Sequence, residues 1–375
     1  MDFNHTDDRR MLGDSLQRFV TDHGGAFIRA AAAKSAPGYS ADLWTKYAEL
    51  GAIGAMFAPE HGGFGGDGFD IMVVFDAIGR GLVAEPFLST LMAGRALASA
   101  GGREDELERI IAGTAIFAFA HQEADAGYDP DHVATLAKRS GDGWVIDGMK
   151  TVVRDAEGAS HLLVSAKAPG LSVDTSGISL FLVPTDTAGL SMQGYPCVDG
   201  GRAAEVRLQQ VQLPSTALVG TANEAKILIA DAIAAGLLAL SAEALGAMEI
   251  VRDATLEYLR TRAQFGAPIG RNQALQHRMA SLLIEIEQAR SAVINAAAAL
   301  NGPVAERDRA LSAAKYTIGR TGTFVAEEAI QLHGGIGMTW ELAMTHFAKR
   351  LMMINHQLGD DDYHLARYAA LSRAA

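Results

Sequence analysis

Two short stretches in the last third of the sequence hold residue types that could bind a ligand carrying phosphates and rings. RTRAQFGAPIGRNQALQH (260–277) contains Arg262, Gln264, Phe265 and Gln273, and AIQLHGGIGMTWE (329–341) contains Gln331, Gly334 and Gly335. An arginine holds a phosphate through a planar fork of donors, a phenylalanine offers an apolar face, and glutamine amides donate and accept hydrogen bonds. Paired glycines let a backbone approach a ligand closely. Each residue alone fits a surface or core role, but their joint spacing favours a binding site.

A third stretch, INHQLGDDDYH (354–364), offers the carboxylates Asp360, Asp361 and Asp362 directly after Gly359. A carboxylate in a cleft can act as a general base. Three in a row after a glycine are more typical of a solvated turn in which an aspartate caps the following helix. The glycine-rich PEHGGFGGDG (59–68) lacks a preceding strand and a following Lys-Ser or Lys-Thr. It therefore indicates a tight turn between helices and not a phosphate loop.

The hydrophobic period changes twice along the chain and predicts three parts. Residues 1–113 are helical; in LWTKYAELGAIGAM, Leu43, Tyr47, Leu50 and Ile53 form one apolar stripe. Residues 114–222 show the period of two that strands require, in WVIDGMKTVV, HLLVSAKA, ISLFLVPT and AAEVRLQQVQLP. Residues 223–375 are helical again. We expect an α+β protein with an N-terminal helical domain, a central antiparallel β domain and a C-terminal four-helix bundle, packed as one unit.

Composition narrows the functional classes. The formal net charge is −12, which argues against nucleic-acid binding because no basic stripe is present to contact phosphates. Cys197 is the only cysteine, which excludes an internal disulfide and a thiolate-rich metal site and fits a reducing cytoplasm. The N-terminus lacks the apolar core of a signal peptide. The most apolar run, IADAIAAGLLALSAEALGAM, is interrupted by Asp231 and Glu243, so we interpret it as a buried helix and not a membrane span.

With these motifs in this order, the chain resembles the acyl-CoA dehydrogenase family. Arg262, Phe265, Gly266 and Gln273 match the family's Arg-x-x-Phe-Gly and downstream Gln, and Gln331, Gly334 and Gly335 match its Gln-x-x-Gly-Gly. ELGAIGAMFAPEHGGFGG, GWVIDGMKTVV and AEVRLQQVQLPSTALVG match three further segments. The resemblance implies an FAD-dependent oxidoreductase of lipid metabolism that desaturates an acyl-CoA thioester and passes electrons to an electron-transferring flavoprotein. It also implies that Arg262 contacts the FAD pyrophosphate, that Phe265, Gln273 and Gln331 contact the adenine, and that Gln264, Gly334 and Gly335 belong to the same site.

The chain departs from the family where the flavin ring and the catalytic base are expected. The glutamate that normally removes the α-proton is replaced by Leu358, and the alternative position for it on an earlier helix holds Gly236. We expect Glu243, two turns further along that helix, to be a structural hydrogen-bonding group. The family's Thr-Glu-Pro, Gly-Ser-Asp and Trp-x-Thr correspond to Gln122-Glu123-Ala124, Gly127-Tyr128-Asp129 and Val152-Val153-Arg154. Gln122 then takes the place of the threonine that faces the flavin, and no catalytic residue is assigned.

Retained dinucleotide elements and a missing base predict a helper subunit. In the family, FAD lies between subunits, so this chain could complete the FAD site of a second acyl-CoA dehydrogenase-like chain that carries the glutamate. The departures resemble the small subunits of two-subunit dehydrogenases, such as those for pimeloyl-CoA and for steroid side-chain degradation. A homo-oligomer is expected when the chain is expressed alone. The alternatives are a self-sufficient dehydrogenase with Asp360 as base, a flavin-dependent monooxygenase of the same fold, and a non-enzymatic scaffold.

Overall fold

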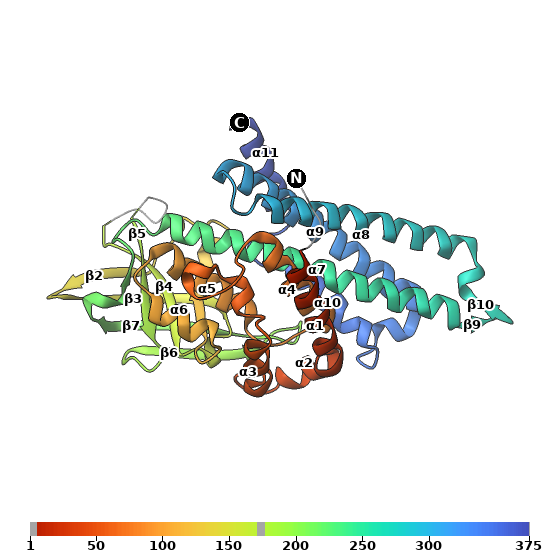
Figure 1. Cartoon of the computed structure of the whole chain (residues 1–375), viewed down its shortest axis with the longest axis horizontal. Coiled ribbons are helices and arrows are strands. Elements are labelled where there is room, and N and C mark those ends of the chain that lie inside the picture. The colour runs from red at the N-terminus through yellow and green to blue at the C-terminus, as the bar shows by residue number, and fades with distance from the viewer. Residues whose placement is uncertain (1–5, 171–176, 375) are drawn as a thin grey trace.

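The computed structural model describes residues 6–170 and 177–374. Within these ranges the chain forms helices, then a sheet, then long helices (Figure 1). The N-terminal segment is predicted not to be a signal peptide. Its first residues, 1–5, lie outside the described ranges.

The N-terminal part is helical. The glycine-rich stretch forms the turn before α4, as predicted: Gly62 and Gly66 adopt positive φ angles of 87° and 88°. A Cβ on Gly63 would lie 2.1 Å from the carbonyl oxygen of Phe57, so the turn is too tight for any side chain there. The helices are α1 (Asp7–His23), α2 (Ala26–Ala32), α3 (Ala41–Glu49), α4 (Gly68–Gly81), α5 (Phe87–Ala100) and α6 (Glu104–Ile111).

The apolar stripe predicted near α3 is only partly right. Tyr47 is buried, but α3 ends at Glu49, so Leu50 and Ile53 lie outside the helix. Leu50 is exposed, and Trp44 is buried beside Tyr47 instead. Gly51, with a φ of 80°, ends the helical pattern before the stripe is complete.

The central part is one sheet with the order β6-β7-β3-β2-β4-β5-β8, and β1 pairs with β4. Most pairings are antiparallel, as predicted, but β1 and β2 run parallel to β4. All four predicted strands are present, as β3, β4, β5 and β7. The strands are β1 (Phe117–Ala120), β2 (Leu136–Ser140), β3 (Gly143–Arg154), β4 (His161–Lys167), β5 (Ile178–Pro184), β6 (Leu190–Pro196), β7 (Arg202–Leu213) and β8 (Leu218–Val219).

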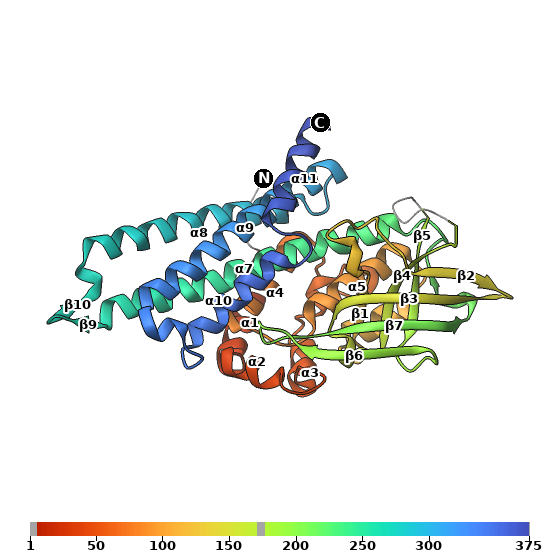
Figure 2. The same cartoon turned by 180° about the vertical axis from the view of Figure 1, so that it is seen from behind.

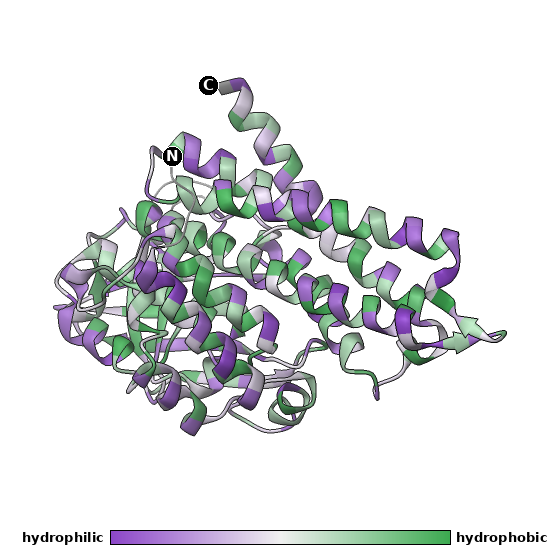
Figure 3. Ribbon diagram, turned by 45° about the vertical axis from the view of Figure 1, so that its right-hand side comes forward, coloured by the Kyte–Doolittle hydropathy of each residue, from purple (hydrophilic) through white to green (hydrophobic). Residues whose placement is uncertain are grey.

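The C-terminal part is a bundle of long helices that projects away from the sheet (Figure 2). On α8, Met279, Leu282, Ile286 and Val293 are buried and Leu275 is partly buried, so one face of this helix packs against the core. Hydrophilic and hydrophobic residues alternate along the outer helices, as this packing requires (Figure 3). The elements are α7 (Lys226–Thr261), β9 (Ala263–Gln264), β10 (Ala267–Pro268), α8 (Gln273–Ala299), α9 (Val304–His333), the 3-10 turn η7 (Gly334–Met338), α10 (Ala343–His356) and α11 (Asp361–Ala374).

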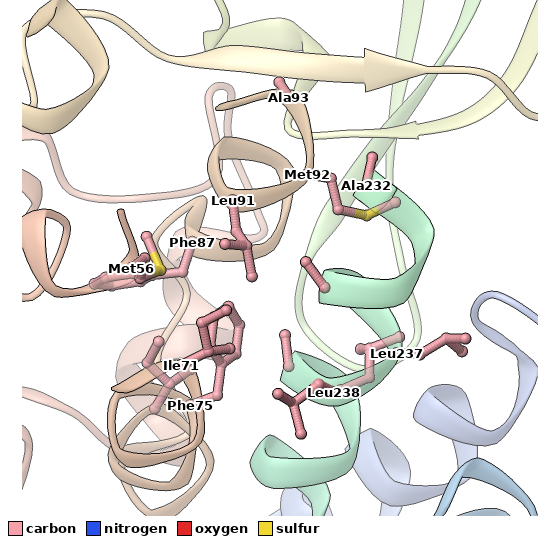
Figure 4. Packing of buried hydrophobic residues seen from close by; sticks show 14 of the residues in the cluster. Met56, Ile71, Phe75, Phe87, Leu91, Met92, Ala93, Ala232, Leu237 and Leu238 are labelled. Atoms are coloured by element: carbon pink, nitrogen blue, oxygen red, sulfur yellow. The ribbon is translucent and has the colours of Figure 1, made fainter. Parts of the chain in front are cut away.

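Helix α7 joins the three parts. By length and composition it could span a membrane, but 72% of its most apolar window is buried inside the fold, as the sequence predicted. It packs against α4 and α5, where Phe75, Leu91 and Met92 meet Ala232, Leu237 and Leu238 (Figure 4). The same helix also packs against α8, α9 and α10. Helix α7 therefore contributes to the packing of both helical parts.

Candidate functional site

Three helix ends meet at the tip of the bundle and bring the two sequence motifs together. Tyr258 near the end of α7 stacks on His333 at the end of α9, with ring centroids 4.4 Å apart. Arg278 near the start of α8 pairs with Glu328 of α9 at 2.6 Å, from Nε to Oε2. Arg262, Gln273 and Gln331 follow or flank these contacts and all three are exposed. The predicted binding residues thus form one outward-facing surface, which we call the tip surface and which also includes Gln264, Phe265, Gly334 and Gly335.

Phe265 projects from the tip surface on a hairpin. Strands β9 and β10 are joined by Phe265 and Gly266, with φ angles of 52° and 81°. Turns with two positive φ angles normally carry asparagine, aspartate or glycine, because a larger side chain is strained there. Phe265 is fully exposed, at 105% of its reference area. An aromatic ring held in a strained conformation and in full contact with water points to a binding role.

The glycines of the tip surface face open space. A Cβ placed on Gly266, Gly334 or Gly335 would meet no atom within 4 Å. Gly334 has a φ of 66° and so has a backbone reason to be glycine. Gly335 has neither a positive φ nor a crowded Cβ. The chain itself does not require glycine at 335, which leaves room for an external group to approach the backbone.

A second site lies far from the tip, where α7 passes between the helical and β parts. Leu358 and Gly236 meet there: a Cβ on Gly236 would lie 2.8 Å from Leu358 Cδ1 and 2.9 Å from Met92 Sδ. The two positions at which the family resemblance places a catalytic base therefore converge on one point. Neither residue carries a group that can accept a proton.

A cavity of about 120 Å³ opens beside Leu358. Its wall is apolar on the α7 side, where Ile229, Ile233 and Leu237 line it, and Gln122 and Tyr128 face it from the β part. Three lining carboxylates all have partners. Asp131 pairs with Lys226, Asp308 pairs with Arg367 at 2.9 Å, and Asp129 accepts a hydrogen bond of 2.9 Å from the backbone amide of Asp131.

Glu123, next to Gln122, is a buried structural carboxylate. It accepts hydrogen bonds of 2.7 Å from Lys150 Nζ and of 2.7 Å from Thr135 Oγ1. Burial alone would raise the pKa of Glu123, but the Lys150 ammonium and these hydrogen bonds hold it below its ordinary value. Burial also lowers the pKa of Lys150 to about 8. The neighbouring His121 contacts Ser165 Oγ at 2.9 Å, and burial lowers its pKa to about 3, so its ring is neutral.

The acidic run caps a helix. Asp360 Oδ1 accepts a hydrogen bond of 2.9 Å from the amide of Tyr363 at the start of α11, as predicted for a capping aspartate. Asp361 exchanges hydrogen bonds with Asn355, at 3.1 Å and 3.2 Å. Burial raises the pKa of the Tyr128 phenol, and the charge of the nearby Asp360 carboxylate raises it further. Asp360 is thus held at the start of α11 by its capping hydrogen bond.

Glu243 belongs to a buried cluster of charges. Arg350 donates to both of its carboxylate oxygens at 2.6 Å and 2.7 Å, and also to Asp199 Oδ2 at 2.7 Å. Arg29 and Arg154 lie 3.7 Å from the same Asp199 oxygen. Burial would raise the pKa of Asp199, but these three guanidinium groups hold it well below its usual range. Glu243 therefore has the structural role expected from the sequence.

Comparison with known proteins identifies the chain. Models of the N-terminal, middle and C-terminal domains of acyl-CoA dehydrogenase match residues 6–115, 118–211 and 228–371. Probable acyl-CoA dehydrogenase YngJ of Bacillus subtilis is 31% identical over 78% of this chain and 79% of its own length. The chain belongs to the acyl-CoA dehydrogenase family. Acyl-CoA dehydrogenase IpdE2 of Mycolicibacterium smegmatis is 29% identical over 97% of this chain and 99% of its own. A solved structure named Tcur3481-Tcur3483 steroid ACAD is 28% identical, with a TM-score of 0.87 over 98% of both chains.

Acyl-CoA dehydrogenases are FAD-dependent oxidoreductases, and the tip surface of this acyl-CoA dehydrogenase fits the adenosine end of FAD. The exposed Arg262 guanidinium suits a diphosphate, the Phe265 ring suits an adenine face, and the open backbone at Gly335 admits close approach. The side of the chain expected to face the flavin ring fits the cofactor less well than the tip surface does. Its cavity of about 120 Å³ is smaller than the roughly 300 to 1,000 Å³ of ordinary ligand sites.

Sequence reasoning missed Asp199, Arg29 and Arg350, because their pairing joins distant segments and has no local pattern.

Proposed function

We propose that this chain is the glutamate-free, small-type subunit of a hetero-oligomeric acyl-CoA dehydrogenase. Its tip surface completes the FAD site of a second acyl-CoA dehydrogenase-like chain, and that chain supplies the catalytic glutamate. The substrate is an acyl-CoA thioester, and an electron-transferring flavoprotein accepts the electrons. The observation that carries the proposal is the pairing of a preserved, outward-facing dinucleotide surface with two base positions occupied by Leu358 and Gly236.

The separation of the two sites supports sharing between chains. At a rise of about 1.5 Å per residue, α7 extends about 38 Å from Gly236 to Thr261, next to the tip surface. The chain of single bonds that joins the two ring systems of FAD is much shorter than this. One FAD is too short to reach both sites of one chain, so an FAD held at the tip surface would have its flavin ring against another chain.

The surface chemistry supports the same arrangement. Phe265 is fully exposed and the glycines at 266, 334 and 335 face open space, so the tip surface alone leaves a bound dinucleotide in water on one side. A fully exposed apolar ring is stabilised when another chain covers it. The likeness to the Tcur3481-Tcur3483 structure, whose name joins two chains, agrees with a two-chain assembly.

Bound FAD supplies the acceptor for the hydride that leaves the substrate. Residues of this chain would hold it: Arg262 would pair with the diphosphate, Phe265 would offer an apolar face to the adenine, and Gln273 and Gln331 would supply amide groups to the ring edge. Leu358 and the apolar wall of α7 can exclude water but cannot remove the substrate's α-proton. Proton removal then requires a carboxylate from the partner chain.

Co-expression tests the proposal directly. We expect the chain alone to turn over acyl-CoA weakly, lacking most of the roughly 10²- to 10⁴-fold that general-base catalysis contributes. Co-expression with a dehydrogenase-like chain that carries the glutamate should yield a complex with FAD and turnover. Mutating that glutamate to Gln should abolish turnover while FAD stays bound. Ordinary turnover by the lone chain would contradict the helper-subunit assignment.

A further inference from the structure

A second cavity lies between α9, η7 and α10, apart from the cavity beside Leu358. Its volume is about 330 Å³, within the range of small-molecule sites of roughly 300 to 1,000 Å³. Most of its wall is apolar or aromatic. It is lined by Ala326, Glu327, Ile330, Gly337, Met338, Thr339, Trp340, Thr345, Ala348, Lys349 and Met352.

Lys349 places a charge in this apolar setting. Its Nζ atom is shielded from solvent and has no hydrogen-bond partner among residues 6–170 and 177–374. It lies 2.9 Å from the centroid of the Trp340 ring. The indole face stabilises the ammonium in part, but a desolvated cation without an anion or acceptor remains costly. Burial accordingly lowers the pKa of Lys349.

The neighbouring polar groups already have partners. Thr345 Oγ1 donates to the Gly337 carbonyl at 3.1 Å, Thr339 Oγ1 donates to the Ile336 carbonyl at 2.8 Å, and the His346 ring contacts the Trp340 carbonyl at 3.2 Å. These contacts hold η7 and the following loop against α10. Unlike these groups, Lys349 Nζ has no hydrogen-bond partner among the described residues.

We propose that this cavity binds a small amphipathic monocarboxylate. The carboxylate pairs with Lys349 Nζ, and the apolar body packs on Ile330, Met338 and Met352 with Trp340 along one side. Glu327 is the other charged residue of the wall and is exposed. Its carboxylate repels a second negative charge, which favours a singly charged head group over a phosphate. The cavity is lined by residues of this chain alone.

Trp340 offers a direct readout. Trp44 and Trp144 are buried, at 2% and 7% exposure, whereas Trp340 is 66% exposed. We would titrate the purified full-length oligomer with octanoate and with octanol while following tryptophan fluorescence. We expect a saturable change with octanoate, much weaker binding of octanol, and no signal in Trp340→Phe. Equal affinity for octanoate and octanol would overturn the proposal. Absence of octanoate binding would also overturn it, and that result is expected if a partner chain fills the cavity.

Lys349 variants test the assigned contact. Lys349→Met keeps an apolar side chain of similar length but removes the charge, and it should weaken octanoate binding by roughly ten- to a hundred-fold, as loss of a hydrogen bond to a charged group predicts. Its octanol binding should be unchanged, which separates loss of the charge from collapse of the cavity. Lys349→Arg should retain octanoate. Octanoate affinity should also fall with rising pH, because a lysine of lowered pKa loses its charge earlier. Equal octanoate affinity in Lys349→Met and the parent protein would refute the site.

Discussion

Leu358 Cδ1 lies 2.8 Å from the point that a Cβ on Gly236 would occupy. Two positions distant in sequence thus share one point in space, at the junction of α7 with the turn before α11. A carboxylate at either position could serve the same cavity. In this chain the leucine side chain fills the space that glycine leaves, so the junction is closed by packing.

Gly236→Ala tests that packing. The added methyl group would press on Leu358 Cδ1 and Met92 Sδ, which are the far ends of flexible side chains, and alanine gains about 1 kcal/mol of helix propensity over glycine. We expect a net change in the free energy of unfolding within about 1 kcal/mol. Gly79→Ala is the control, because its Cβ would lie 1.9 Å from the backbone oxygen of Glu243. It should cost about 3 kcal/mol or more. Urea denaturation measures both, and similar costs would contradict the packing argument.

Arg350→Met should destabilise the fold strongly. It leaves Glu243 and Asp199 without their closest partner in the buried cluster, and breaking a buried pair costs about 3 to 5 kcal/mol. Arg367→Met is the matched control, since Arg367 pairs with Asp308 near the surface, where such pairs contribute about 0 to 1 kcal/mol. Thermal unfolding of both variants would distinguish the two pairs. Equal melting temperatures would show that the cluster adds no stability.

Stability should decline as pH falls below 6.5. Burial lowers the pKa of His121 to about 3 and that of His364 to about 4. Below pH 6.5 the unfolded chain binds protons that the folded chain does not, so the free energy of unfolding falls with pH until the folded-state pKa values are reached. Each of the two histidines contributes up to about 1.4 kcal/mol per pH unit to the slope of the free energy of unfolding against pH. His121→Gln should reduce the slope between pH 6 and 4, as measured by urea denaturation. An unchanged slope would mean that His121 is protonated in the folded state.

FAD retention should depend on Arg262 and not on its neighbour Arg260. Arg262→Ala loses charge-assisted contacts of about 1.5 to 3 kcal/mol, equivalent to roughly ten- to hundred-fold weaker binding. Both arginines are exposed, so neither substitution should lower the melting temperature by much. The measurement is the flavin-to-protein ratio of the complex after dilution and gel filtration. Arg262→Ala with a full complement of FAD, or equal losses in both variants, would contradict the assignment of the tip surface.

The sequence predicted the helices and strands better than the long-range contacts between them. Met279, Leu282 and Ile286 repeat with the helical period and are buried on α8. The buried face of a helix can be predicted because the spacing of its apolar residues is visible in the local sequence. The strand β6 was not predicted, since its residues alternate only weakly between buried and exposed. The tip motifs could be identified from spacing. The convergence of Leu358 on Gly236 and the cluster around Asp199 could not, because long-range packing alone brings those residues together.

Asp360 provides the sharpest test between a helper subunit and a self-sufficient enzyme. Its side chain caps α11 by accepting from the Tyr363 amide, and asparagine caps a helix about as well as aspartate. Asp360→Asn should therefore preserve both stability and the turnover of the co-expressed complex. Asp360→Ala should lose about 0.5 to 2 kcal/mol of stability, as loss of a helix cap predicts, and still leave turnover intact at a permissive temperature. Paired thermal unfolding and acyl-CoA turnover assays separate the two roles. If Asp360→Asn abolishes turnover in a complex that remains folded and retains FAD, the aspartate is the catalytic base and the partner's glutamate is not required.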